Sequence, residues 1–202
     1  MIKYMCHLIE TIKVSGKQFL NIACHNGRMN HARLKLFGNS DKIDIAQSVR
    51  IPADLGEGVY KCTVTYSRNI VKAEFSLYSI RKIRSLKAVH CNSIEYEYKY
   101  ADRSLLNSLL QQRMGCDEII IVKDGKLTDT SFSNIILYDG SNWVTPDTPL
   151  LKGTKREKLL REGFISEASV SMSDLNKFDK VSLINSMLDP GDIIADCRNI
   201  LA

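Results

Sequence analysis

Residues 118–146 read EIIIVKDGKLTDTSFSNIILYDGSNWVTP, a stretch in which apolar runs alternate with short polar turns. Two Asp-Gly pairs, Asp124-Gly125 and Asp139-Gly140, each lie between two such runs. An Asp-Gly pair in this setting is a strong hairpin signal, because a tight turn needs residues that tolerate positive φ angles. The stretch therefore predicts two consecutive β-hairpins.

The segments that flank these hairpins predict a mixed structure. The leucines of residues 102–115 recur at helical spacing, and Asp102 precedes them as an expected N-cap. Downstream, residues 153–162 predict a short helix and residues 180–188 a buried strand. We therefore expect a larger, β-rich C-terminal subdomain over residues 85–202.

The first part of the chain predicts an antiparallel sheet that carries one helix. Apolar and polar residues alternate over 59–66 and 70–78 about a short polar turn, which predicts a hairpin. An earlier hairpin is expected over residues 3–23, and residues 24–37 have the apolar spacing of a helix. We assign this smaller subdomain to residues 1–84, so the predicted fold class is α+β with two subdomains.

The composition is that of a globular protein. Hydrophobic residues make up 44% of the 202 residues and charged residues 25%, which excludes wholesale disorder. The apolar runs are shorter than the roughly 20 residues of a membrane-spanning helix, and the first residues lack a signal-peptide pattern. The six cysteines form no Cys-x-x-Cys pair, and the four histidines have no metal-ligand spacing. We expect a cytoplasmic protein without a membrane partner or a metal site.

The charge gives little reason to expect a nucleic-acid partner. The chain carries 28 basic and 23 acidic residues, a net charge of +5. The densest basic stretch, residues 81–87, belongs to no zinc-finger, RNA-binding-sheet or recognition-helix pattern. A modestly basic surface equally attracts anionic metabolites, so we expect a small-molecule ligand and no nucleic acid.

Three cationic or polar segments have both an ordinary and a functional interpretation. Lys99 lies in the stretch 94–100, whose alternation of residue types predicts a strand. It is either an exposed charge at the strand edge or an amine whose pKa burial lowers to make it a nucleophile. Arg28 either covers the core with its aliphatic stem or binds an anion. Gly153 and Thr154 either simply begin a helix or offer N–H groups and a hydroxyl to a phosphate. The residues alone leave these alternatives open.

Motifs along the chain keep the order and spacing of one known family. Over residues 97–160 a lysine precedes a helix, an acidic hairpin follows the pattern dG-x-(V/L)-x-E-x-x-x-x-N-(I/L)-F, and a segment of the form TP…L-x-G-(I/V)-T-R comes after it. Residues 25–29 (HNGRM) are similar to an H-x-x-R-(L/M) helix, and residues 185–187 (NSM) fall where the family has G-T-A or N-A-L. Together these features resemble the aminotransferase class IV family, the pyridoxal-phosphate enzymes of fold type IV.

The resemblance implies a short member of this family, with a D-amino-acid-aminotransferase-like fold and pyridoxal 5′-phosphate as cofactor. Lys99 would form the Schiff base with the cofactor and shuttle a proton, and Arg28 would bind its phosphate. Asp129 stands where the family usually has Glu beside the pyridine nitrogen, and its side chain is one methylene shorter. The other cofactor-binding residues implied are Leu151, Gly153, Thr154 and Ser186.

The resemblance leaves more than one reaction open. Transfer of an amino group between an amino acid and a 2-oxo acid is the first expectation. The alternative is a 4-amino-4-deoxychorismate lyase, which eliminates pyruvate and leaves 4-aminobenzoate, because Lys99-x-x-x-Arg103 and Asn185-Ser186-Met187 are similar to lyase segments. Arg103 and Asn185 are then the candidate substrate contacts, although Arg103 is equally explained as a helix-surface side chain. A third hypothesis is a degenerate, non-catalytic member, and the family implies a homodimer.

Overall fold

The computed structural model describes residues 6–201 and divides into two compact units. The first unit extends to Ser79 and also includes Tyr98–Asp102, whereas the second comprises Ile80–Glu97 and the chain from Arg103 onward. The chain therefore leaves the first unit, enters the second, and returns briefly to the first. No local sequence pattern predicted this return. The first residues of the hairpin expected over 3–23 lie outside the described residues.

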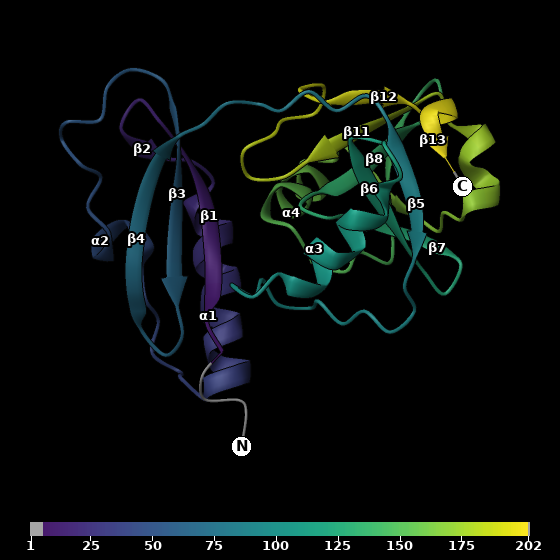
Figure 1. The fold of residues 1–202 in the computed structure, drawn as a ribbon. Coiled ribbons are helices and arrows are strands. Elements are labelled where there is room, and N and C mark those ends of the chain that lie inside the picture. Colours follow the sequence, from purple (N-terminus) through teal and green to yellow (C-terminus); the bar gives the residue numbers. More distant parts are fainter. Residues whose placement is uncertain (1–5, 202) are drawn as a thin grey trace. The chain divides into compact units, whose positions relative to one another are not determined.

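The first unit is a four-stranded sheet in the order β2-β1-β3-β4, with one long helix (Figure 1). Its elements are β1 (Leu8–Ser15), β2 (Gln18–Phe19), α1 (Ile22–Phe37), α2 (Ile45–Ser48), β3 (Val59–Tyr66) and β4 (Ile70–Leu77). All of its strand pairs are antiparallel, which confirms the hairpin predicted over 59–78. Helix α1 ends at Gly38, whose φ of 73° is a left-handed conformation that suits glycine.

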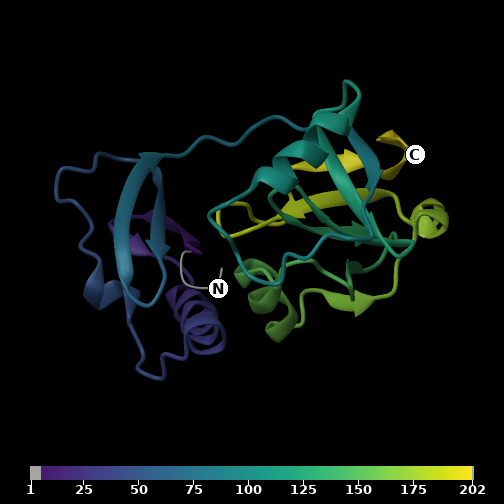
Figure 2. The same ribbon diagram turned by 60° about the horizontal axis from the view of Figure 1, so that its bottom comes forward.

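Helix α1 covers one face of this sheet, as the two views show (Figures 1 and 2). Every second residue of β1 is buried, as expected for a strand with one face against a core. Met29 and Ala32 of α1 pack with Leu8, Ile12 and other strand residues in the core of the unit. Glu10 belongs to the same buried face of β1 and is also fully buried, so its carboxylate needs partners within the unit.

The returning segment pairs with the start of β1. Ile9 N donates to Lys99 O and Ala101 N to His7 O, each at 2.9 Å. The regular strand predicted over residues 94–100 does not form, and only a single bridge remains at Tyr100. The prediction was wrong because the alternating apolar residues serve two cores: Ile94 packs in the second unit, whereas Tyr100 packs against the first.

The second unit is built on a nine-stranded mixed sheet. Seven strands follow the order β10-β9-β8-β7-β6-β5-β13, and β11 pairs with β8 and β12. The strands are β5 (Leu86–His90), β6 (Glu118–Lys123), β7 (Lys126–Thr130), β8 (Asn134–Tyr138), β9 (Trp143–Pro146), β10 (Ser166–Ala168), β11 (Lys180–Ile184), β12 (Ile194–Asp196) and β13 (Ile200–Leu201). Both Asp-Gly hairpins are confirmed, since Asp124-Gly125 joins β6 to β7 and Asp139-Gly140 lies between β8 and β9.

Two helices cover the face of this sheet that lies opposite the largest core. Helix α3 (Ser104–Leu110) packs against Ile119 and Ile121, whereas the alternate residues Ile120 and Val122 of the same strand enter the largest core. Helix α4 (Thr154–Arg161) packs against Ile136 of β8 in the same way. The N-cap position of α3 is occupied by Arg103 rather than by the expected Asp102.

Among residues 6–201, no helix is both long enough and apolar enough to cross a membrane. The same residues contain no group of three or more His, Cys, Asp or Glu side chains arranged to hold a metal ion.

Candidate functional site

The residues singled out in the sequence are divided between the two units. Arg28 and Lys99 belong to the first unit. The second unit contains the others: Arg103, Asp129, Leu151, Gly153, Thr154, Asn185 and Ser186.

A buried carboxylate lies at the centre of the second group. Asp129 is 6% exposed near the end of β7, opposite Asn134 at the start of β8. Asn134 Nδ2 donates to Asp129 Oδ1 at 2.7 Å, and Leu151 N donates to Oδ2 at 2.9 Å. Burial raises the pKa of Asp129 to about 6, even though both hydrogen bonds lower it. The group is thus a fixed acid that titrates close to neutral pH.

Gly153 allows Asn134 to reach this carboxylate. A Cβ atom at position 153 would lie 1.9 Å from Asn134 Oδ1, so only glycine fits there. Asn134 Nδ2 also donates to Leu151 O at 2.8 Å, which ties the β8 strand to the segment before α4. The structure therefore brings Asp129, Leu151 and Gly153 together. Asn134 was missed as a site residue, although it stands at the Asn of the hairpin motif.

The first turn of α4 is polar and buried. Gly153 is its N-cap and has no side chain to cap the helix, and Thr154 is 2% exposed. The ammonium group of Lys155 pairs with Asp189, and Arg156 Nη2 lies 2.5 Å from Glu167 Oε1. Counted from Gly153 along the motif G-(I/V)-T-R, Lys155 occupies the Thr position, which the sequence analysis overlooked.

Arg28 is held by a buried carboxylate in the first unit. Its Nε and Nη2 atoms donate to Glu10 Oε1 and Oε2 at 2.8 and 2.5 Å. His25 Nδ1 lies 2.6 Å from Glu10 Oε2. Burial by itself would raise the pKa of Glu10, but the charge of Arg28 and the hydrogen bonds from Arg28 and His25 lower it to about 2. The orientation of the Arg28 guanidinium is thus set by β1.

Lys99 is half-buried in the returning segment beside β1. The carbonyl of the same residue accepts the hydrogen bond from Ile9 N, so the backbone at Lys99 is fixed by the sheet of the first unit. The flanking residues Glu97 and Arg103 belong to the second unit.

Arg103 and Asn185 both bind the turn between β7 and β8. Arg103 Nη2 donates to Ser131 O at 2.6 Å, and Asn185 Nδ2 donates to Phe132 O at 3.4 Å. Asn185 also accepts two backbone hydrogen bonds through Oδ1, so it shapes the turn that carries the half-buried Ser186. These contacts with a backbone turn were not foreseen from the sequence.

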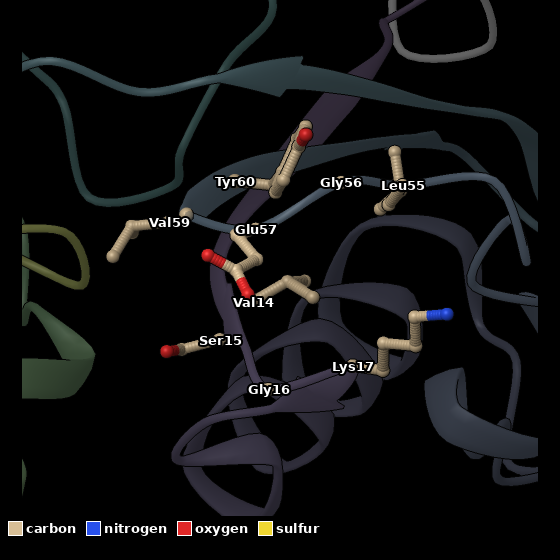
Figure 3. A pocket seen from close by; sticks show the side chains of 10 residues that line it. Val14, Ser15, Gly16, Lys17, Leu55, Gly56, Glu57, Val59 and Tyr60 are labelled. Atoms are coloured by element: carbon tan, nitrogen blue, oxygen red, sulfur yellow. The ribbon is translucent and has the colours of Figure 1, made fainter.

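A separate cavity of about 590 Å³ lies at the other end of the first sheet (Figure 3). Val14 and Tyr60 line it from β1 and β3, and Glu57 lines it from the loop before β3. Lys17 also lines it, and its ammonium group donates to Ala53 O. None of the residues singled out in the sequence lines this cavity.

Comparison with known proteins identifies the family. The sequence pattern of the family described as amino-transferase class IV matches residues 7–190. The chain belongs to this family. It is 39% identical, over 91% of its length and 98% of the relative's, to an uncharacterized protein of Haemophilus influenzae.

Solved structures of class IV proteins resemble the chain closely. One, from Haemophilus somnus, is described as a candidate 4-amino-4-deoxychorismate lyase. It is 35% identical, with a TM-score of 0.84 over 91% of this chain and 97% of that chain. Another, from Mesorhizobium loti, is described as a candidate amino-acid aminotransferase, at 22% identity and a TM-score of 0.81 over 97% and 100%. The predicted α+β architecture of fold type IV is confirmed.

A more distant structure of the same fold was solved with a bound cofactor. A hypothetical aminotransferase from Mycobacterium tuberculosis was solved in its PLP-bound form. It is 16% identical, with a TM-score of 0.71 over 96% of this chain and 81% of that chain. Pyridoxal phosphate is thus bound by one protein that has this fold.

Proposed function

We propose that the protein is a pyridoxal-phosphate enzyme acting on an amino-acid-like small molecule, with Lys99 as the residue that binds the cofactor covalently. The observation that carries the proposal is the buried Asp129 carboxylate, held by Asn134 and by Leu151 N beside the start of α4. A carboxylate held in this way can stabilise the positive charge of a protonated ring nitrogen in a bound heterocycle.

The polar groups of the second unit suit such a cofactor. Pyridoxal phosphate supplies an electron sink for bonds at the α-carbon of an amino acid. Asp129 would keep a proton on the ring nitrogen, and the two hydrogen bonds would hold its carboxylate in one orientation. Because Asp is one methylene shorter than Glu, the ring would have to lie closer to the strand or be reached through a water. Leu151 would pack against the ring. Thr154 would bind the phosphate through its hydroxyl and the N–H groups that begin α4, and Ser186 would add a second hydroxyl.

Two cationic residues of the first unit would also bind the cofactor. Arg28 would add a charge-assisted hydrogen bond to the phosphate, its guanidinium oriented by Glu10. Lys99 would attach through Nζ and, when released, would take a proton from the substrate α-carbon and return it. A degenerate, non-catalytic member would have no chemical need for all of Lys99, Arg28 and the Asp129–Asn134 pair.

Transamination is the reaction we propose first. The second candidate is 4-amino-4-deoxychorismate lyase activity, which is favoured by the description of the Haemophilus somnus structure at 35% identity and by the Lys99-x-x-x-Arg103 spacing. In both reactions a proton is removed from the carbon that bears the substrate's amino group. The same residues could therefore act in either reaction.

Product analysis separates the two reactions. The protein with pyridoxal phosphate is incubated once with an amino-acid donor panel plus 2-oxo acids, and once with 4-amino-4-deoxychorismate. A new amino acid and a new oxo acid support the aminotransferase, whereas 4-aminobenzoate and pyruvate support the lyase. The Lys99→Ala variant is the control and is expected to form neither. No product in either incubation would leave the non-catalytic hypothesis in first place.

The cellular setting of this activity is also part of the proposal. We expect a homodimer, as the family implies, located in the cytoplasm with its small-molecule substrate. Light scattering on the eluting protein should then give twice the mass of one chain.

A further inference from the structure

The turn that joins β7 to β8 is held by side chains from other segments. Ser131 N donates to Glu118 Oε1 at 3.3 Å, and Ser131 O accepts from Arg103 Nη2 at 2.6 Å. Asn185 binds the next carbonyl of the turn, that of Phe132. Both backbone polar groups of Ser131, which is 4% exposed, are thus bound by side chains of opposite charge.

This turn determines where the buried acid lies. Asp129 precedes the turn and Asn134 follows it, and their side chains are joined by a hydrogen bond. Within the turn, Thr130 Oγ1 accepts a hydrogen bond from Ser133 N at 3.0 Å. Only Thr130 separates Ser131 from Asp129, so a displacement of Ser131 is expected to move the Asp129 carboxylate as well.

Glu118 is buried at a cost that packing does not explain. It is fully buried, and its Oε1 atom also accepts a hydrogen bond from Ile119 N. Its Oε2 atom has no hydrogen-bond partner among residues 6–201, and Arg81 Nη2, on an exposed side chain, lies 3.9 Å away. A buried polar atom without a partner costs on the order of 1–3 kcal/mol, and ion pairs of this kind contribute little net stability. In return, the Glu118 side chain binds two backbone N–H groups, its neighbour's at Ile119 and that of the distant Ser131.

We propose that Glu118 and Arg103 are positioning residues that clamp Ser131 from two sides and thereby fix the Asp129 carboxylate for its part in the chemistry. The inference rests on the proposed function of Asp129 and assigns a role to Glu118, which the family motifs quoted above do not include. Neither residue acts on the reacting atoms directly. Arg103 takes a positioning role in place of a substrate contact.

Two substitutions at position 118 separate the reach of the side chain from its charge. Glu118→Gln keeps an acceptor at the same reach and removes the charge, whereas Glu118→Asp keeps the charge and withdraws the acceptor by one methylene. The readout is the pKa of Asp129, measured by NMR of its carboxyl carbon in cofactor-free protein. We expect Gln to leave this pKa within a few tenths of wild type. Asp should lower it by about one pKa unit, because a loosened turn admits water.

A matched control distinguishes positioning from general destabilisation. Ser182 is fully buried in the same unit, and its Oγ atom donates to Ile193 O at 3.0 Å. Ser182→Ala should lower stability without moving the pKa of Asp129. Equal pKa changes in Glu118→Gln and Glu118→Asp, or a change in Ser182→Ala as large as in Glu118→Asp, would overturn the clamp.

A second variant covers the case in which Glu118→Asp does not fold. Arg103→Met removes the other side of the clamp while keeping a long side chain, and the pKa of Asp129 should fall by a similar amount. An unchanged pKa in this variant contradicts the proposal. Because the measurement needs no cofactor, a failed clamp and a failed cofactor assignment give different results.

Discussion

At the scale of single residues, Gly153 is the position most tightly constrained by its neighbours. Gly153→Ala would drive a methyl group into Asn134 Oδ1, since the Cβ position lies 1.9 Å from that oxygen. We expect a loss of about 1–3 kcal/mol in the free energy of unfolding, the usual cost of overpacking. Urea denaturation measures it.

Gly27 provides the control for this prediction. It lies within α1, and a Cβ atom there would meet nothing within 4 Å. Gly27→Ala should therefore raise stability by roughly 0.5–1 kcal/mol, since alanine is the better helix former. Equal effects at the two glycines would show that the contact with Asn134 does not constrain position 153.

The raised pKa of Asp129 should make the free energy of unfolding depend on pH. Its pKa in the folded chain, about 6, lies above the ordinary value of 3.8. Between these two pH values the folded carboxyl keeps its proton while the unfolded one loses it, so the free energy of unfolding falls as pH rises through this window and stays reduced above it. The difference of about two pKa units corresponds to roughly 3 kcal/mol.

Asp129→Asn removes this titration. Denaturation of the cofactor-free variant between pH 4 and pH 7 should show a flatter pH dependence than that of wild type, by up to roughly 3 kcal/mol over the window. Parallel pH profiles for the two proteins would mean that Asp129 titrates near its ordinary value and is not the buried acid described above.

At the scale of elements, Glu10 joins β1 to α1. Its pKa is lowered from 4.5 to about 2, so the carboxylate stabilises the fold above pH 4.5 and this stabilisation is lost as pH falls toward 2. Glu10→Gln should reduce the free energy of unfolding at neutral pH by about 3 kcal/mol, because the hydrogen bonds from Arg28 and the contact with His25 lose their charged acceptor. The same variant should lose less additional stability in acid than wild type.

An exposed ion pair in the same sheet is the control for the effect of burial on the stability that Glu10 contributes. Lys72 and Glu74 lie 2.9 Å apart with more than half of each side chain exposed. Glu74→Gln should change stability by less than about 1 kcal/mol, as is typical of surface pairs. A loss at Glu74 that matched the loss at Glu10 would remove burial as the cause.

Much of the element order was predictable from local patterns. The Asp-Gly turns, the 59–78 hairpin and α1 are defined by short-range periodicity and turn chemistry, which act within a few residues of chain. The strand predicted over residues 94–100 was wrong because its alternating apolar residues are buried in two different cores. Periodicity carries no information about which core a side chain enters. The predicted strand at 180–188 ends at Ile184, since Asn185 bonds two backbone N–H groups of the following turn.

The candidate site was predictable only as far as its motifs. Asp129, Gly153 and Leu151 were named from spacing, and the structure brings them together. The roles of Asn134 and Glu118 depend on hydrogen bonds between strands that are distant in sequence, which no local pattern reveals. Two further residues were predictable from the family motifs. Asn134 stands at the Asn of the hairpin motif, and Lys155 stands at the Thr of the G-(I/V)-T-R motif.

At the scale of the whole molecule, the short return of the chain to the first unit is the feature to test. Tyr100 packs against the core of that unit and pairs with Leu8 of β1. Tyr100→Ala should loosen the returning segment and speed hydrogen exchange at the Ile9 and Ala101 amides, which bond across this pairing. The Leu20 amide, bonded to Lys13 O elsewhere in the unit, should be unaffected. A uniform increase at all three amides would mean that the substitution destabilises the whole unit and would contradict a local role in this pairing.

The central claim is that Lys99 binds pyridoxal phosphate covalently, and one measurement tests it most directly. Wild type, Lys99→Ala and the control Lys72→Ala are each mixed with pyridoxal phosphate, freed of excess cofactor and examined by visible absorption. Borohydride reduction and peptide mass analysis then locate the label. We predict a lysine-linked band in wild type and Lys72→Ala, its loss in Lys99→Ala, and a label on Lys99. A wild type that retains no cofactor, or a Lys99→Ala variant that keeps the same band, would contradict the claim.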